Sequence, residues 1–416
     1  MNRNHPEGQL QSLAYYMHSK LFCLEHLAIK PMHRMDFMKM GLAHANTRSA
    51  DVLIVGGGPA GLAAAIAARQ KGFEVIVADR NRPAIDKSCG EGLMSDGVEA
   101  LRALGVDIPA AESFSFRGIR FVGPASHVEA SFESTRGIGV RRTTLHRLLL
   151  DRAAKLGVQF FWESRFTGIG ARGYSVDGNA IQARWLIGAD GLDSTIRRQY
   201  GLDSHFSGPR RFGFRRHYRT APWTDFAELH WGNGCQIYVT PVGAEEICVA
   251  VISQGHQLRL DQALPIFPEL RARMRCAKSV GTERGGVTLS RVLRRVVRGN
   301  VALVGDASGS VDAISGQGLC LSFRQSLALA DALEAADLKR YSRAHRKLMA
   351  KPLLSSSVLL TLARHTWLRE RILPVLSSDP GRFARLLSLH AGPSGNREPE
   401  SHAITPLAFQ RLNGSD

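Results

Sequence analysis

The stretch DVLIVGGGPAGLAAAIAARQKGFEVIVADR, residues 51–80, decides the fold. It begins with the β-branched apolar run 52–55, which is typical of a strand buried on both faces. The alanine-rich segment 62–70 predicts a helix that ends at Gly72. A second apolar run, 75–78, predicts another strand. The stretch therefore predicts a βαβ unit, and with it an α/β fold.

Three glycines between the first strand and the helix have the spacing G-x-G-x-x-G, at Gly56, Gly58 and Gly61. The first permits a tight turn, the second lets a pyrophosphate approach the backbone, and the third lets helix and strand pack closely. The positive end of the helix that follows points toward the phosphates. This pattern predicts a dinucleotide site.

The second strand ends at Asp79 and Arg80, about 20 residues beyond the glycines. A carboxylate at this place accepts hydrogen bonds from a ribose diol and disfavours a 2′-phosphate. We therefore expect FAD or NAD rather than NADP. A glycine-rich turn without a ligand is the alternative, which the combination of strand, helix and acid disfavours.

Two later strands also end in a small residue and a carboxylate. The apolar run 185–187 leads to Asp190 and Gly191, and the run 301–304 leads to Gly305 and Asp306. Each pattern delivers an acceptor from a buried strand to a ligand hydroxyl, although one alone could be a turn or a helix cap. A turn-rich loop with Gly316 and Gly318, and a helix starting near Leu319, follow the second strand.

In the order G-x-G-x-x-G, D-G-x-x-S-x-x-R and G-D-A, the chain resembles the flavoprotein hydroxylases of the para-hydroxybenzoate hydroxylase fold and the related geranylgeranyl reductases. The resemblance covers about residues 51–335. It implies a Rossmann-like FAD-binding domain, an inserted mixed β-sheet substrate domain and C-terminal helices. It also implies noncovalent FAD, bound by Gly56, Gly58, Pro59, Ala60, Gly61, Asp79, Arg80, Arg142, Asp190, Gly191, Gly305, Asp306, Gly316, Gly318 and Leu319.

On this basis we expect five segments. They are a disordered leader (1–49), the first part of the FAD-binding domain (50–205, with a substrate-side segment near 90–136), the substrate-domain sheet (206–285), the second part of the FAD-binding domain (286–340), and C-terminal helices with a flexible tail (341–416).

Two stretches depart from the hydroxylase pattern. After Asp306 the chain reads ASGSVDAISGQG, where hydroxylases have Ala-His and a proline, and KSCGEGLM at 87–94 resembles the reductase branch. The central strands nevertheless lack the Tyr-x-Trp-x-Phe-Pro stretch of the prenyl reductases. They contain Tyr238-Val-Thr-Pro241, and the combination most resembles bacterial FAD-dependent oxidoreductases of polyketide-type pathways.

The expected activity is an NAD(P)H-consuming monooxygenase that hydroxylates an aromatic or polyketide-type small molecule. The alternative is a flavin-dependent reductase of isoprenoid or quinone double bonds, and a third reading is a flavin-binding protein without turnover. Because only one G-x-G-x-x-G of the chain lies within a predicted βαβ unit, NAD(P)H is expected to visit as a co-substrate rather than to occupy a Rossmann domain of its own.

Three polar side chains on the predicted strands 211–218, 228–231 and 236–240 are candidates for catalysis. His217, His230 and Tyr238 would contact substrate if one face of this sheet covers the flavin. A histidine that titrates near neutrality suits removal of a phenolic proton. The alternative for each histidine is a place in the core or at the solvent surface.

Composition limits the partners. The chain of 416 residues has a formal net charge of +17, but its arginines are scattered and match no nucleic-acid-binding motif. We expect no nucleic acid partner, and an anionic membrane surface is one alternative source of the charge pattern. Six cysteines without a C-x-x-C pair predict neither a metal site nor a disulfide scaffold, and indicate the cytoplasm.

The two ends differ from the rest of the chain. The leader is polar and rich in His and Met, and no run of 18 apolar residues occurs anywhere. The basic, amphipathic segment KPLLSSSVLLTLARHTWLRERILPVL predicts a helix that covers the FAD lobe. The alternative is a patch that rests on the inner surface of a membrane and admits a lipophilic substrate.

Overall fold

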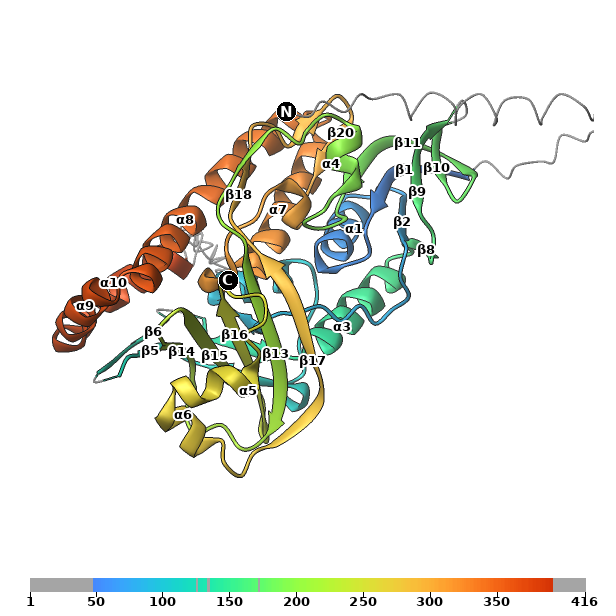
Figure 1. The fold of residues 1–416 in the computed structure, drawn as a ribbon. Coiled ribbons are helices and arrows are strands. Elements are labelled where there is room, and N and C mark those ends of the chain that lie inside the picture. Colours follow the sequence, from blue (N-terminus) through green and yellow to red (C-terminus); the bar gives the residue numbers. More distant parts are fainter. Residues whose placement is uncertain (1–47, 125, 133–134, 171–172, 392–416) are drawn as a thin grey trace, which may run out of the picture. The chain divides into compact units, whose positions relative to one another are not determined.

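The computed structural model describes residues 48–391, except 125, 133–134 and 171–172 (Figure 1). The predicted disorder of the leader therefore lies outside the described residues, apart from positions 48 and 49. The same holds for the flexible tail from residue 392 onward.

A parallel sheet forms the core of the FAD-binding lobe, and its strands come from distant parts of the chain. β1 (Arg48–Val55) pairs with β2 (Val75–Asp79) on one side and β11 (Asn179–Gly188) on the other. β8 (Gln159–Trp162) and β20 (Val301–Leu303) extend the sheet in the same direction. Because these strands are parallel, their carboxyl ends meet at one edge, and the three strand-end motifs of the sequence meet there too. Three short antiparallel strands complete the sheet: β9 (Phe166–Gly170), β10 (Gly173–Val176) and β19 (Val297–Arg298).

Helix α1 (Pro59–Gln70) is buried along most of its length. Its run of alanines allows close contact with α3 (Arg142–Lys155) and α7 (Gly318–Glu334). α2 (Ser95–Ala103) packs on α7, while α4 (Thr195–Gln199) follows β11. The helix predicted to start near Leu319 is thus present one residue earlier.

A second, seven-stranded sheet has the order β17-β13-β16-β15-β14-β5-β6. All neighbours are antiparallel except β14 and β5. One face packs on the short helices α5 (Leu260–Ala263) and α6 (Pro268–Arg273). The strands are β5 (Gly118–Val122), β6 (His127–Ser131), β13 (Arg211–Arg219), β14 (Phe226–Trp231), β15 (Cys235–Gly243), β16 (Glu246–Ser253) and β17 (Lys278–Thr288).

Short elements connect the two lobes. One small sheet has the order β3-β7-β4, and another joins β12 to β18. The loop after Leu303 contains the 3-10 helices η3 (Gly305–Ser308) and η4 (Ala313–Ser315). The small strands are β3 (Gly92–Leu93), β4 (Ser113–Phe116), β7 (Gly137–Val140), β12 (His205–Ser207) and β18 (Arg291–Leu293), and two further 3-10 helices are η1 (Ala110–Glu112) and η2 (Leu264–Ile266).

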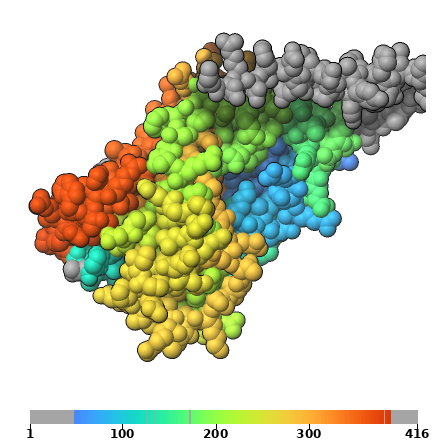
Figure 2. All heavy atoms as spheres, viewed as in Figure 1, coloured from blue at the N-terminus to red at the C-terminus, as the bar shows by residue number. Residues whose placement is uncertain are grey.

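The chain continues into α8 (Leu338–Arg364), α9 (Thr366–Ser378) and α10 (Pro380–Ala391). α8 packs on α7, and both α9 and α10 contact β6. In Figure 2 these helices, orange to red, form a continuous outer surface on one flank. Among residues 48–391 that the structure describes, no helix is long and apolar enough to cross a membrane. The Rossmann-like lobe, the inserted mixed sheet and the C-terminal helices of the sequence prediction are confirmed.

Candidate functional site

A cavity of about 290 Å³ lies where the carboxyl edge of the parallel sheet meets the seven-stranded sheet. One wall is formed by the glycine turn, the loop 87–94, and the starts of α3 and α7. The other wall comes from β13, β15, β16 and β17. The predicted FAD-binding residues that line it are Gly58, Pro59, Ala60, Arg142, Gly191, Gly305, Asp306, Gly316, Gly318 and Leu319.

The glycine turn has the geometry that a pyrophosphate needs. Gly56 has φ +116°, and a Cβ atom there would lie 2.3 Å from the carbonyl oxygen of Ala189. A Cβ atom on Gly61 would lie 1.8 Å from the carbonyl oxygen of Gly56. A Cβ atom on Gly58, by contrast, would meet nothing within 4 Å. Gly56 and Gly61 therefore serve close packing, while Gly58 leaves the approach to the backbone open.

The charges in the cavity also fit FAD. Lys87 and Arg142 line it together with Asp306, and the buried Nε atom of Arg142 has no partner among the described residues. α1 and α7 both begin at this wall, so their positive ends face the space where a pyrophosphate would lie. The carboxyl of Asp306 faces the cavity, and the surrounding protein shields it from bulk solvent. This burial raises its pKa, although Lys87 and Arg142 act in the opposite direction. The residues that line the cavity thus fit a bound FAD.

Asp79 braces the glycine turn. Its Oδ2 accepts a hydrogen bond from the backbone N–H of Gly57 at 2.6 Å, and its Oδ1 accepts one from that of Asn81 at 2.8 Å. Neither Asp79 nor Arg80 is on the cavity wall. A carboxylate has about four acceptor sites, so contact of Asp79 with an adenosine ribose stays a prediction.

Asp190 caps a helix. Its carboxylate accepts hydrogen bonds from the Ser194 hydroxyl at 2.5 Å and from the backbone N–H groups of Thr195 at 2.6 Å and Ile196 at 3.1 Å. The buried Arg197 donates to the carbonyl oxygen of Ala307 at 3.2 Å. The D-G-x-x-S-x-x-R motif thereby joins the end of β11 to the loop that carries Asp306. Of its first two residues, only Gly191 lines the cavity.

The three catalytic candidates lie in three different places. Tyr238 lines the cavity, donates its hydroxyl proton to the carbonyl oxygen of Ile314, and has a pKa raised by burial. His230 faces the opposite side of the sheet, because Leu229 rather than His230 is paired with Tyr238 and alternate residues point to opposite faces. Its ring contacts Phe267 edge-on, and its Nε2 lies 3.0 Å from a Glu228 oxygen. The expectation that His230 faces the flavin is therefore wrong.

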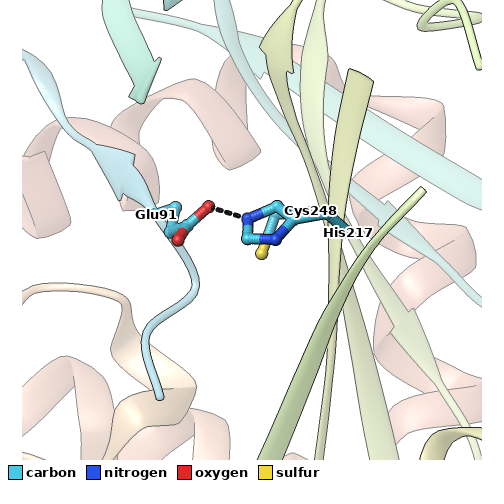
Figure 3. A group of neighbouring side chains, drawn as sticks. All are labelled: Glu91, His217 and Cys248. Atoms are coloured by element: carbon cyan, nitrogen blue, oxygen red, sulfur yellow. Dashed lines mark hydrogen bonds and ion pairs between the residues drawn. The ribbon is translucent and has the colours of Figure 1, made fainter. Parts of the chain in front are cut away.

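His217 is on the same side of β13 as Gly213, which lines the cavity, and its ring faces Glu91 on the loop 87–94 (Figure 3). Its Nε2 is 2.6 Å from Glu91 Oε2, and its Nδ1 is 3.3 Å from Nη1 of Arg215. A guanidinium only donates, so Nδ1 must accept and Nε2 must carry the proton that it gives to Glu91. Both ring nitrogens are engaged, and His217 is not among the residues of the cavity wall.

Glu91, His217 and Cys248 offer a carboxylate, an imidazole and a thiol within 4.8 Å of one another (Figure 3). Arg215, 3.6 Å from Glu91, already supplies positive charge, and burial raises the pKa of the Cys248 thiol well above its usual value. A protonated thiol beside a resident cation disfavours a metal ion.

We interpret this cluster as a brace for the loop that lines the cavity. Glu91 has φ +60°, and its Oε1 accepts a hydrogen bond from the backbone N–H of Arg142 at 2.9 Å. The brace therefore connects the loop both to β13 and to the start of α3. The sequence pointed to the Cys-Gly-Glu-Gly stretch but not to Glu91, because nothing in the motif signals a buried carboxylate.

Comparison with known proteins agrees with this site. The family described as FAD binding domain matches residues 49–254. The menaquinone reductase of Mycobacterium tuberculosis is 28% identical over 324 residues, which cover 70% of this chain and 78% of that protein. The digeranylgeranylglycerophospholipid reductase of Thermoplasma volcanium is 29% identical over 300 residues, covering 65% and 74%.

The flavin-dependent brominase Bmp2 shares the fold, with a TM-score of 0.72 at 18% identity over 82% of this chain and 93% of that one. The cavity, the matching FAD-binding domain and the reductase relatives lead to one conclusion: this chain is an FAD-dependent oxidoreductase.

Proposed function

We propose that the protein reduces a carbon–carbon double bond of an isoprenoid or quinone-type lipid. The observation that carries this proposal is the apolar wall that the seven-stranded sheet presents to the cavity, with Ile119, Ala227, Ala250 and Ile252, and without a histidine among the described lining residues. The curated relatives that are named as reductases support the same reaction class.

Different residues of the cavity contact the cofactor and the substrate. Bound FAD supplies hydride transfer. The glycine turn, Arg142 and Asp306 hold the cofactor, and the apolar wall excludes water from the reacting carbons. We propose NAD(P)H as the electron donor, because the sequence has no second dinucleotide motif and a visiting co-substrate needs none. Reduction then adds one hydride equivalent and one proton, so the product gains two hydrogen atoms.

Hydroxylation of an aromatic or polyketide-type molecule is the second candidate. The hydroxyl-bearing residues Tyr238 and Thr240 favour it, because both line the cavity and could orient a phenol. A phenol would still have to lose its proton. The described lining residues offer no imidazole for this, and the phenolic proton of Tyr238 is engaged with Ile314.

One experiment separates the two reactions. The FAD-loaded protein is incubated with NADH or NADPH and a polyprenylated naphthoquinone, first without oxygen and then under ¹⁸O₂. Reduction of a side-chain double bond predicts a product that forms under strict anaerobiosis and stays two hydrogen atoms heavier after any quinol has been reoxidised to the quinone in air. Product that forms only with dioxygen and contains ¹⁸O would replace the reductase by the hydroxylase.

We further propose that the protein works at the surface of an anionic membrane. Leu354 and Val358, on the outer face of α8, are 68% and 51% exposed. Lys347 and Lys351 share that face, since the four positions follow one another at helical spacings of three and four residues. On α9, Trp367 is 59% exposed. An apolar stripe with a tryptophan and adjacent lysines fits the interface of an anionic bilayer.

A further inference from the structure

A second cleft, of about 520 Å³, lies beside the FAD cavity on the same face of the seven-stranded sheet. Along β13, Arg211 in the cleft is two residues from Gly213 in the cavity, and along β15, Gln236 is two residues from Tyr238. Residues two apart on a strand share a face and are separated by about 7 Å. The cleft is therefore the next compartment along the sheet.

A hydrogen-bonded partition separates the two compartments. Arg211 donates to Asp312 at 2.8 Å and also to the side chain of Gln236. Asp312 accepts from the backbone N–H of Ile314, whose carbonyl accepts from Tyr238. Because Asp312 and Gln236 already engage both terminal nitrogens of the buried Arg211, this guanidinium forms a fixed wall with little net charge.

The lining of the cleft is polar and basic. Its polar side chains include Asn233, Gln254 and Arg364, and none of its described lining residues is acidic. Arg364 is exposed at the end of α8, and the described residues place no carboxylate within ion-pair distance of it. Because Arg211 is paired with Asp312 and Arg364 has no acidic partner among the described residues, the cleft keeps one uncompensated positive charge, which favours an anion.

We propose that this cleft binds the phosphate group of a small-molecule ligand, with Arg364 as its charged partner and Gln254 as a neutral donor. The volume lies within the range of small-molecule sites, and a guanidinium matches phosphate geometry. The phosphate could belong to a membrane lipid or to a soluble ester. The proposal concerns binding and is independent of the redox reaction in the FAD cavity.

The test uses the full, FAD-loaded chain and isothermal titration with two probes. Glycerol 3-phosphate presents the phosphate alone, and dihexanoylphosphatidic acid presents it on two short acyl chains. We expect Arg364→Ala to weaken binding at least about tenfold, the effect of losing one charge-assisted hydrogen bond. Gln254→Leu should weaken binding less, and both variants should keep their FAD absorbance because neither residue lines the FAD cavity.

Arg340→Ala is the matched control. It removes the same charge from the same helix, about 36 Å away along α8, and should leave both affinities unchanged within twofold. Much tighter binding of the lipid than of glycerol 3-phosphate identifies a headgroup site, while equal affinities identify a site for soluble esters. Absence of binding by both probes, or equal weakening by Arg340→Ala and Arg364→Ala, overturns the proposal.

Discussion

His345 on α8 lies with its Nε2 2.9 Å from the hydroxyl oxygen of Ser308, in the loop that follows Asp306. The imidazole is 5% exposed, and its burial lowers its pKa to about 4. Four residues earlier on the same helix, Tyr341 donates a hydrogen bond to the carbonyl oxygen of Leu303 at 2.6 Å. The first half of α8 is thus fastened to the strand and loop that deliver Asp306 to the cavity.

This contact predicts a loss of stability in acid. The unfolded histidine binds a proton from about pH 6.5 downward, whereas the folded one stays neutral until about pH 4. The contribution of the neutral imidazole is therefore complete above pH 6.5 and is lost between pH 6.5 and 4, with an upper bound of about 3 kcal/mol. Urea unfolding at pH 7.5 and 4.5 should show a smaller acid-induced loss for His345→Gln than for the wild type. Equal losses would assign the acid sensitivity to other groups.

Asp306 and Asp190 should differ in what their removal costs. The Asp306 carboxylate makes no hydrogen bond to the described residues, while that of Asp190 caps α4. Asp306→Ala should weaken FAD binding by about 1–3 kcal/mol, the cost of an unsatisfied ligand hydroxyl, and leave the apoprotein as stable as the wild type. Asp190→Ala should lower the unfolding midpoint of the apoprotein. Flavin fluorescence titration and urea unfolding measure the two effects, and unchanged FAD affinity in Asp306→Ala would contradict the assignment.

His217 should act by positioning, and two substitutions test this. The amide of His217→Gln can still donate to Glu91, whereas His217→Ala leaves that buried carboxylate with one donor fewer. We expect the His217→Gln variant to retain most activity with an unchanged pH profile. The His217→Ala variant should have a free energy of unfolding lower by about 1–3 kcal/mol. If Gln abolishes turnover while FAD content and stability are unchanged, His217 is a base after all. His230→Gln should leave turnover intact because His230 faces the far side of the sheet.

Membrane binding should depend on the outer face of α8. Val358→Ser removes one exposed apolar side chain, and Lys351→Gln removes one charge worth about 1 kcal/mol near an anionic surface. Both should reduce flotation with phosphatidylserine-containing liposomes at low salt. Val292→Ser is the control, since Val292 is 41% exposed but lies on β18. Flotation that is the same for all three variants would rule out this face as the docking surface.

The sequence specified the FAD-binding lobe because its signals are local. The close approach of Gly61 to the carbonyl oxygen of Gly56 lies within one βαβ unit and is present, whereas the close contact of Gly56 is with Ala189 at the end of β11. Asp190 and Asp306 follow buried parallel strands, so their approach to one edge was predictable before the order of the strands was known.

Which side chains of the seven-stranded sheet line the cavity depended on tertiary structure. Strand pairing decides which alternate residues face the cavity, and the pairing of Leu229 with Tyr238 turned His230 away. A distant segment decided that the His217 ring is buried and hydrogen-bonded, since its partner Glu91 lies 126 positions earlier in the chain. The second cleft exists only because the end of α8 returns to the start of β15. The sequence by itself determined the cofactor and the fold, because each of their motifs is one short, contiguous stretch of the chain. Only the tertiary structure decided which polar groups meet a ligand, because register and long-range burial assign each side chain to a cavity, a core or the solvent.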